Sequence, residues 1–147
     1  MKEGSKIKNF SAEMTGTKEF KLNDYQGKNI VLYFYPRDNT PGCTSEGEDF
    51  RDNFKSFAKK NTLIFGISKD TLKSHENFKD KFNFPFELIS DPEEKICKLF
   101  DVIKEKSMYG KKYMGIERST FLIDSNGKLA KEWRKVKLKG HVEEVLN

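Results

Sequence analysis

The chain has no long hydrophobic run, which argues against a membrane-spanning protein. No apolar stretch among its 147 residues approaches the ~20 residues that a membrane-spanning helix needs. No apolar segment follows the first lysine, so no secretory signal is expected. We therefore expect a soluble cytoplasmic protein whose residues 1–147 form one domain with a core of its own.

Cysteine and histidine are scarce, with two of each. Two cysteines without an export signal indicate a reducing compartment and not a disulfide scaffold. Their spacing matches no zinc site, and the absence of Cys-x-x-Cys argues against a general disulfide oxidoreductase. We expect neither a metal nor a cofactor, and we expect His75 and His141 to lie on surface helices.

Charge of one sign is only slightly in excess, because 28 basic and 23 acidic residues give a net charge of +5. The lysines are interleaved with acidic residues along most of the chain. The densest basic segment, residues 134–139, alternates charged with apolar residues, as the exposed face of a strand does. A solvated face is therefore favoured over a nucleic-acid-binding surface, and neither a nucleic-acid nor a membrane partner is expected.

Strand-like and helix-like segments alternate along the chain. Strands are predicted at residues 28–35, 62–68, 86–89, 119–123 and 129–136. Helices are predicted at 44–59, at 72–82, from Asp91-Pro92 onward, and over a short segment from Gly140. The order predicts an α/β fold with a mixed central sheet flanked by helices, and a core filled largely by the 13 phenylalanines.

Cys43 lies at the turn between the first strong strand and the following helix. The positive end of a helix dipole favours the reactive thiolate, so this cysteine is placed as a nucleophile would be. A buried structural cysteine is the alternative interpretation. Gly42 would let the backbone and a small substrate approach closely.

The start of that helix has two possible registers. Thr40 can be the N-cap with Pro41 in the first helical position. Ser45 with Glu48 also forms a capping-box pattern, which would leave Cys43 just before the helix.

The spacing Pro36-x-x-x-Thr40-x-x-Cys43 resembles the peroxidatic motif of peroxiredoxins. The surrounding sequence, YFYPRDNTPGCTSEGEDFRD, is similar to that of the bacterioferritin comigratory protein branch, also called peroxiredoxin Q. The resemblance extends to essentially the whole chain, because it continues in residues 90–92, 115–124 and 139–146. It implies a thioredoxin-like fold of the AhpC/TSA type, with a short N-terminal extension.

The resemblance also implies an activity and roles for individual residues. It implies an antioxidant enzyme, a thioredoxin-dependent peroxidase that reduces hydrogen peroxide or organic hydroperoxides through a sulfenic acid on Cys43. Thr40 and Arg118 would bind the peroxide and stabilise its charge, and Pro36 would shield the pocket. Glu46 either orients Arg118 or is an ordinary acid of the first helical turn.

The sequence departs from the family pattern at the second thiol. Glu48 occupies the position where many members of this branch have a resolving cysteine, and residues 72–82 contain no cysteine either. Cys97 lies in an apolar helical segment and is interpreted as a small buried residue. We therefore expect no resolving cysteine, reduction by thioredoxin or another external thiol, and a monomer or weak homodimer.

One alternative function is a non-catalytic thioredoxin-like module that senses redox state or binds a partner. It predicts an unactivated Cys43 thiol that reacts slowly with peroxide.

Overall fold

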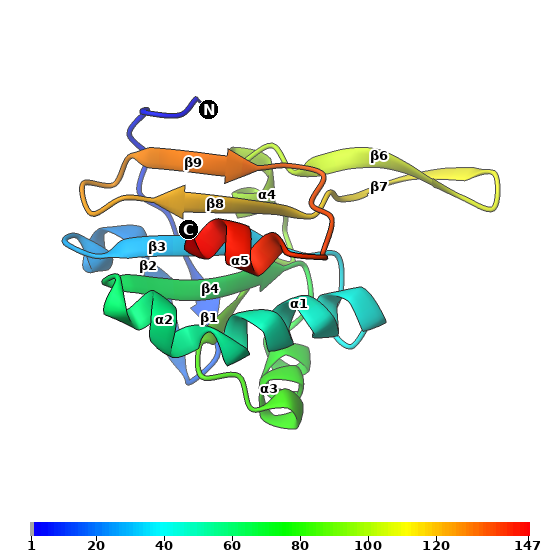
Figure 1. The fold of residues 1–147 in the computed structure, drawn as a ribbon. Coiled ribbons are helices and arrows are strands. Elements are labelled where there is room, and N and C mark those ends of the chain that lie inside the picture. The colour runs from blue at the N-terminus through cyan, green and yellow to red at the C-terminus, as the bar shows by residue number, and fades with distance from the viewer. Residues whose placement is uncertain (1) are drawn as a thin grey trace.

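The computed structural model describes residues 2–147 and is built around a seven-stranded mixed sheet (Figure 1). The strand order is β2-β1-β5-β4-β3-β8-β9. The strands are β1 (Ser11–Met14), β2 (Lys18–Lys21), β3 (Asn29–Phe34), β4 (Thr62–Ser68), β5 (Glu87–Ser90), β8 (Ser119–Ile123) and β9 (Leu129–Trp133). The central strands β3, β4 and β5 are parallel, and the remaining pairs are antiparallel. The predicted α/β fold with a mixed sheet is confirmed.

Two hydrophobic clusters lie on opposite faces of this sheet. Alternate residues of β3 belong to different clusters, because successive side chains of a strand point to opposite faces. One cluster contains buried residues of α1 (Pro41–Asp52), α2 (Phe54–Lys59), α3 (Leu72–Phe82) and α5 (His141–Leu146). The other contains residues of the 3-10 helix η1 (Leu22–Tyr25) and of α4 (Lys95–Leu99). Ten of the 13 phenylalanines are buried, as expected.

Three predicted boundaries are wrong. The 44–59 helix starts earlier and is divided in two at Asn53, whose side-chain amide donates to the carbonyl of Asp49 and so competes with the backbone. α4 begins at Lys95, because residues 92 and 93 form a turn and Glu94 has a left-handed backbone. β9 ends at Trp133, and residues 134–139 form a loop instead of the predicted continuation of the strand.

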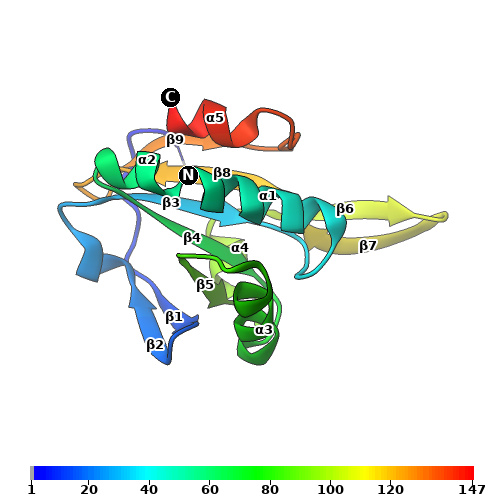
Figure 2. The ribbon, with the colours of Figure 1, turned by 60° about the horizontal axis from the view of Figure 1, so that its bottom comes forward.

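The sequence did not predict a second, two-stranded sheet. Within the described residues 2–147, β6 (Ile103–Met108) and β7 (Lys111–Ile116) pair only with each other. Figures 1 and 2 both show this hairpin projecting away from the central sheet. Its turn residues, Tyr109 and Gly110, have φ values of 53° and 77°, which a tight hairpin turn requires at both positions.

Candidate active site

A buried polar network fixes the loop between β3 and α1. The Tyr35 hydroxyl donates to Asp38 Oδ1 at 2.7 Å, and Asp38 Oδ2 lies 2.8 Å from His75 Nδ1. The other ring nitrogen of His75 donates to the Ile89 carbonyl at 2.9 Å, because a carbonyl oxygen only accepts. The surface position predicted for His75 is therefore wrong. Its ring is fully buried, where these polar partners replace water and join α3 to the loop.

Asp70 completes this network. Its Oδ2 accepts from the Asp38 backbone N–H at 2.9 Å and from the Ser68 hydroxyl at 2.6 Å. Among residues 2–147, Asp38, Asp70 and His75 form the single group of three or more whose side-chain donor atoms are close enough to share a metal ion. Because Asp38 hydrogen-bonds to His75, and each of the two carboxylates also accepts from a neighbouring hydroxyl, we assign the group to holding the loop. The absence of a metal stays a prediction.

The helix that follows the loop starts at Pro41, with Thr40 as its N-cap residue. The first of the two predicted registers is therefore correct, and the capping box at Ser45 does not start the helix. The Thr40 hydroxyl does not cap the helix but donates to the Arg37 carbonyl at 2.9 Å, so its lone pairs remain available as acceptors. Pro36 is half-buried at the start of the loop.

The buried face of α1 places Cys43 and Glu46 beside Arg118. This arginine lies between β7 and β8, and its two terminal nitrogens contact the side chains of Cys43 and Glu46. Its Nη2 donates to Cys43 Sγ at 3.3 Å, and its Nη1 donates to Glu46 Oε1 at 2.6 Å. The fold therefore joins three predicted site residues, although Arg118 is 75 positions from Cys43.

The charges of Glu46 and Arg118 depend on each other. Burial raises the pKa of Glu46 to about 7, although Arg118 opposes the shift, and Glu46 Oε2 has no hydrogen-bond partner among the described residues. Burial tends to lower the pKa of Arg118, but Glu46 and Cys43 outweigh it, so the pKa is raised. The guanidinium therefore remains charged and can donate both to sulfur and to a substrate oxygen.

Gly42 is packed closely by two side chains. A β-carbon at this position would lie 3.2 Å from Leu138 Cδ1 and 3.3 Å from Arg118 Nη2, so a larger residue would have to displace one of them. The Val136 N–H donates to the Arg118 carbonyl at 3.0 Å and holds the 134–139 loop against the site. Sequence reasoning missed Leu138, because it assigned part of this loop to a strand.

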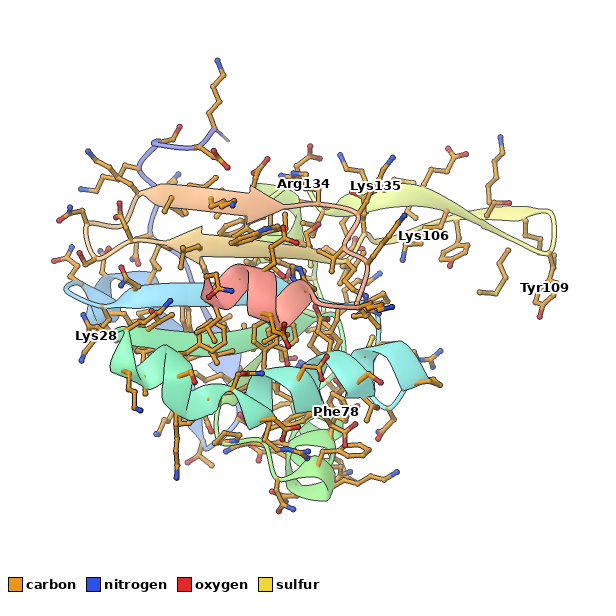
Figure 3. All side chains as sticks on the ribbon, in the orientation of Figure 1. Lys28, Phe78, Lys106, Tyr109, Arg134 and Lys135 are labelled. Carbon is orange, nitrogen blue, oxygen red and sulfur yellow. The ribbon has the colours of Figure 1, made fainter. Side chains whose placement is uncertain are left out.

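Lys106 and Tyr33 also border the site and were not predicted. Burial and then Arg118 lower the pKa of Lys106, whereas Cys43 and Glu117 oppose this shift. Figure 3 shows Lys106 on the hairpin between its base and Tyr109 at its free end. The Tyr33 hydroxyl is buried and has no hydrogen-bond partner among residues 2–147, and burial, then Glu46 and Cys43, raise its pKa. The Tyr109-Gly110 turn could have revealed the hairpin and hence Lys106.

The remaining cysteine and histidine lie elsewhere. Both cysteines are free, and Cys97 belongs to the hydrophobic cluster on the face of the sheet opposite Cys43. The Cys97 backbone N–H donates to Asp91 Oδ2 at 2.8 Å. The surface position predicted for His141 is wrong, because its ring packs inward with Nε2 2.8 Å from Thr120 Oγ1.

Comparison with known proteins places these features in a family. Residues 4–132 match the AhpC/TSA family. The chain belongs to this family. Peroxiredoxin Bcp of Bacillus subtilis is 60% identical to this peroxiredoxin over 126 residues, which cover 86% of this chain and 80% of the relative. Peroxiredoxin Bcp of Xanthomonas campestris is 50% identical over 133 residues, covering 90% and 83% of the two chains.

Solved structures agree with this assignment. A cysteine-to-serine mutant of Xylella fastidiosa PrxQ has a TM-score of 0.95 at 44% identity, with 100% of this chain and 94% of the other covered. The bacterioferritin comigratory protein of Xanthomonas campestris has a TM-score of 0.89 at 47% identity, with 93% and 87% covered.

These relationships confirm the thioredoxin-like fold and the peroxiredoxin Q branch. The protein is a thiol-dependent peroxidase with an antioxidant role, and the alternative of a non-catalytic module is not favoured. No helix within residues 2–147 is long and apolar enough to cross a membrane.

Proposed function

We propose that Cys43 is the thiol with which this peroxiredoxin attacks peroxide, and that Thr40 and Arg118 hold the substrate. The contact of 3.3 Å between Arg118 Nη2 and Cys43 Sγ, in the first turn of α1, carries this proposal. The guanidinium and the positive end of the helix both favour the thiolate over the thiol.

In the proposed step, the thiolate attacks one peroxide oxygen and the O–O bond breaks. The leaving oxygen takes a proton and departs as water or an alcohol, and Cys43 becomes a sulfenic acid. Arg118 stabilises the charge that develops on the leaving oxygen, while the Thr40 hydroxyl accepts from the peroxide O–H. The Gly42 backbone N–H is an additional donor, because the first N–H groups of a helix have no partner within it. Pro36, which has no N–H, shields the pocket from water.

The substrates we propose are hydrogen peroxide and organic hydroperoxides. The solved Xanthomonas campestris relative is described as having alkyl peroxide reduction activity. Leu138 adds an apolar side chain next to Gly42, which suits an alkyl group.

The sulfenic acid is proposed to return to the thiol by reaction with an external thiol, thioredoxin or a similar protein. Cys97 is fully buried on the opposite face of the sheet, and this position supports a one-cysteine mechanism. We propose that the protein acts in the cytoplasm, as a monomer or weak homodimer.

A single-turnover experiment tests these assignments. Reduced protein is mixed with one equivalent of peroxide in a stopped-flow instrument, and its intact mass is then measured. We expect wild type and Cys97→Ser to consume peroxide equally and to gain one oxygen atom, and Cys43→Ser to do neither. Full activity in Cys43→Ser would overturn the assignment of the nucleophile. A peptide that links Cys43 to Cys97 within one chain would overturn external reduction.

A further inference from the structure

Exposed hydrophobic side chains gather on the β6–β7 hairpin. Among residues 2–147, the large hydrophobic residues that are exposed are Met108 (56%), Tyr109 (98%), Tyr113 (43%) and Met114 (58%). A two-stranded hairpin gains little stability from exposing such groups, and an exposed apolar patch is typical of an interaction surface. Figure 3 shows Tyr109 at the free end of the hairpin, far from the central sheet.

The strand register gives the hairpin two different faces. Lys106 pairs with Tyr113 and Met108 pairs with Lys111, and directly paired residues share a face. We call this the inner face, defined by Lys106, Met108, Lys111 and Tyr113. The outer face is defined by Glu105, Ser107, Lys112 and Met114, and its Lys112 and Glu105 form an ion pair at 3.6 Å. The inner face is therefore basic and apolar, whereas the charges of the outer face balance.

The inner face leads to the reactive thiol. Lys106 is half-buried on β6, and Arg118, which follows β7 after one intervening residue, donates to Cys43 Sγ at 3.3 Å. Strands rise about 3.4 Å per residue, so the hairpin reaches roughly 20 Å from its base. A surface of this length exceeds what a hydroperoxide would cover and suits a macromolecule.

The charge around the thiol indicates the chemistry of that macromolecule. Residues 103–116 contain four lysines and one glutamate, and residues 134–139, which pack against Gly42 and Arg118, contain four basic residues and no acid. These two segments carry a net charge of +7, more than the +5 of the whole chain. An acidic partner is complementary to this surface, whereas two hairpins of two copies would repel each other.

We propose that the inner face is the docking surface for an acidic protein dithiol that reduces oxidised Cys43. This inference rests on the proposed function. Cys43 is 2% exposed, so a reductant has to be held beside the site while the sulfur becomes accessible. Met108 and Tyr113 provide the apolar contact, and Lys106 and Lys111 provide the charge.

The reaction at this surface is a transfer of two electrons. A thiolate of the partner attacks Sγ of the sulfenic acid, and the hydroxyl group leaves with a proton as water. A mixed disulfide remains, and the second thiol of the partner displaces the Cys43 thiolate from it. The partner dithiol becomes a disulfide, and Cys43 is reduced.

Two methionines of nearly equal exposure on opposite faces give a matched test. Hydrogen peroxide turnover is measured with an acidic thioredoxin, recycled by its reductase and NADPH, and in parallel with dithiothreitol. We expect Met108→Ser to lower kcat/KM for thioredoxin roughly tenfold, because it removes one of the two apolar side chains of the inner face. Turnover with dithiothreitol should not change, and Met114→Ser should match wild type in both assays. Lys111→Glu and Lys112→Glu repeat the comparison for charge, with circular dichroism to verify folding.

Equal effects of Met108→Ser and Met114→Ser on turnover with thioredoxin would overturn the proposal. So would the finding that dithiothreitol reduces oxidised Cys43 of the wild type whereas thioredoxin does not. A wild-type dimer in analytical ultracentrifugation that Met108→Ser dissociates would assign the face to a second copy of the chain instead. Slower oxidation of Cys43 by an anionic hydroperoxide in Met108→Ser, with thioredoxin kinetics unchanged, would assign it to substrate. Failure of wild-type Cys43 to be oxidised in the absence of reductant would contradict the proposed function, and not the docking surface.

Discussion

Cys43 and Cys97 are both buried thiols on helices, yet their surroundings have opposite charge. Cys43 lies in the first turn of a 12-residue helix and accepts a hydrogen bond from the Arg118 guanidinium. Cys97 lies in a five-residue helix beside the Asp91 carboxylate. Burial, followed by Asp91, raises the pKa of the Cys97 thiol.

The comparison shows that burial alone does not determine what a cysteine does. Removal from water disfavours a thiolate, and only a compensating positive charge can offset this. Cys43 has that charge from a side chain and from a helix end, whereas Cys97 has a carboxylate that opposes ionisation. The sheet lies between the two environments, so each thiol responds to its own neighbours.

Removing the guanidinium should have the largest effect, because it makes the surroundings of Cys43 resemble those of Cys97. We expect Arg118→Met to slow single-turnover oxidation of Cys43 roughly 100- to 1,000-fold, as loss of a preorganised donor does in other enzymes. Stopped-flow fluorescence with hydrogen peroxide measures the rate.

Arg118→Lys is the matched control for charge. Lysine keeps a positive charge but cannot donate from two nitrogens in one plane. The oxidation rate of this variant should therefore lie between those of wild type and Arg118→Met. Oxidation of Arg118→Met at the wild-type rate would show that the helix end alone activates Cys43.

The strand–turn–helix context of Cys43 could be predicted from the sequence, because it depends on residues that are adjacent in the chain. Residues 36–43, which form the loop and the start of the helix, contain Pro36, Thr40 and Cys43. The distant Arg118 came only through the family resemblance, since composition alone would have assigned it to an exposed strand end. Its contact with Cys43 and Glu46 depends on how β8 pairs with β3, which no local pattern encodes.

The errors have a related cause. His75 has the sequence neighbours of a surface helix, but Asp38, 37 positions away, supplies the polar partner that allows it to be buried. The β6–β7 hairpin escaped prediction because strands exposed on both faces show no clean alternation of apolar and polar residues. In both cases the missing information lies in tertiary contacts.

The Glu46 carboxyl should give the Cys43 site a pH dependence between pH 4.5 and about 7. Its pKa is raised to about 7 in the folded protein from an ordinary 4.5, so the folded state holds a proton that the unfolded state loses. Stability from this group is therefore present below pH 4.5 and decreases as the pH rises to about 7. His141 acts in the opposite direction, because burial lowers its pKa.

The difference between wild type and Glu46→Gln isolates the effect of this one carboxyl. Urea unfolding should show that the free energy of unfolding of wild type, relative to the variant, falls by about 3 kcal/mol between these pH values. Single-turnover oxidation should slow only several-fold, since Arg118 keeps its contact with Cys43. A constant difference across this pH range would mean that Glu46 is already ionised at low pH.

The smallest effect is expected from changing Cys97, which tests whether the two thiols are independent. Cys97→Ala should leave thioredoxin-supported turnover unchanged, because Cys97 belongs to the core on the opposite face of the sheet. It should lower the free energy of unfolding by about 1–2 kcal/mol, as loss of a packed core group does. Cys97→Ser keeps the size of the side chain and a donor for Asp91, so it should lose less stability than Cys97→Ala if the contact with this carboxylate matters. An equal fall in turnover in both variants, with stability preserved, would mean that Cys97 takes part in recycling Cys43. The sheet would then not keep the two thiols apart during catalysis.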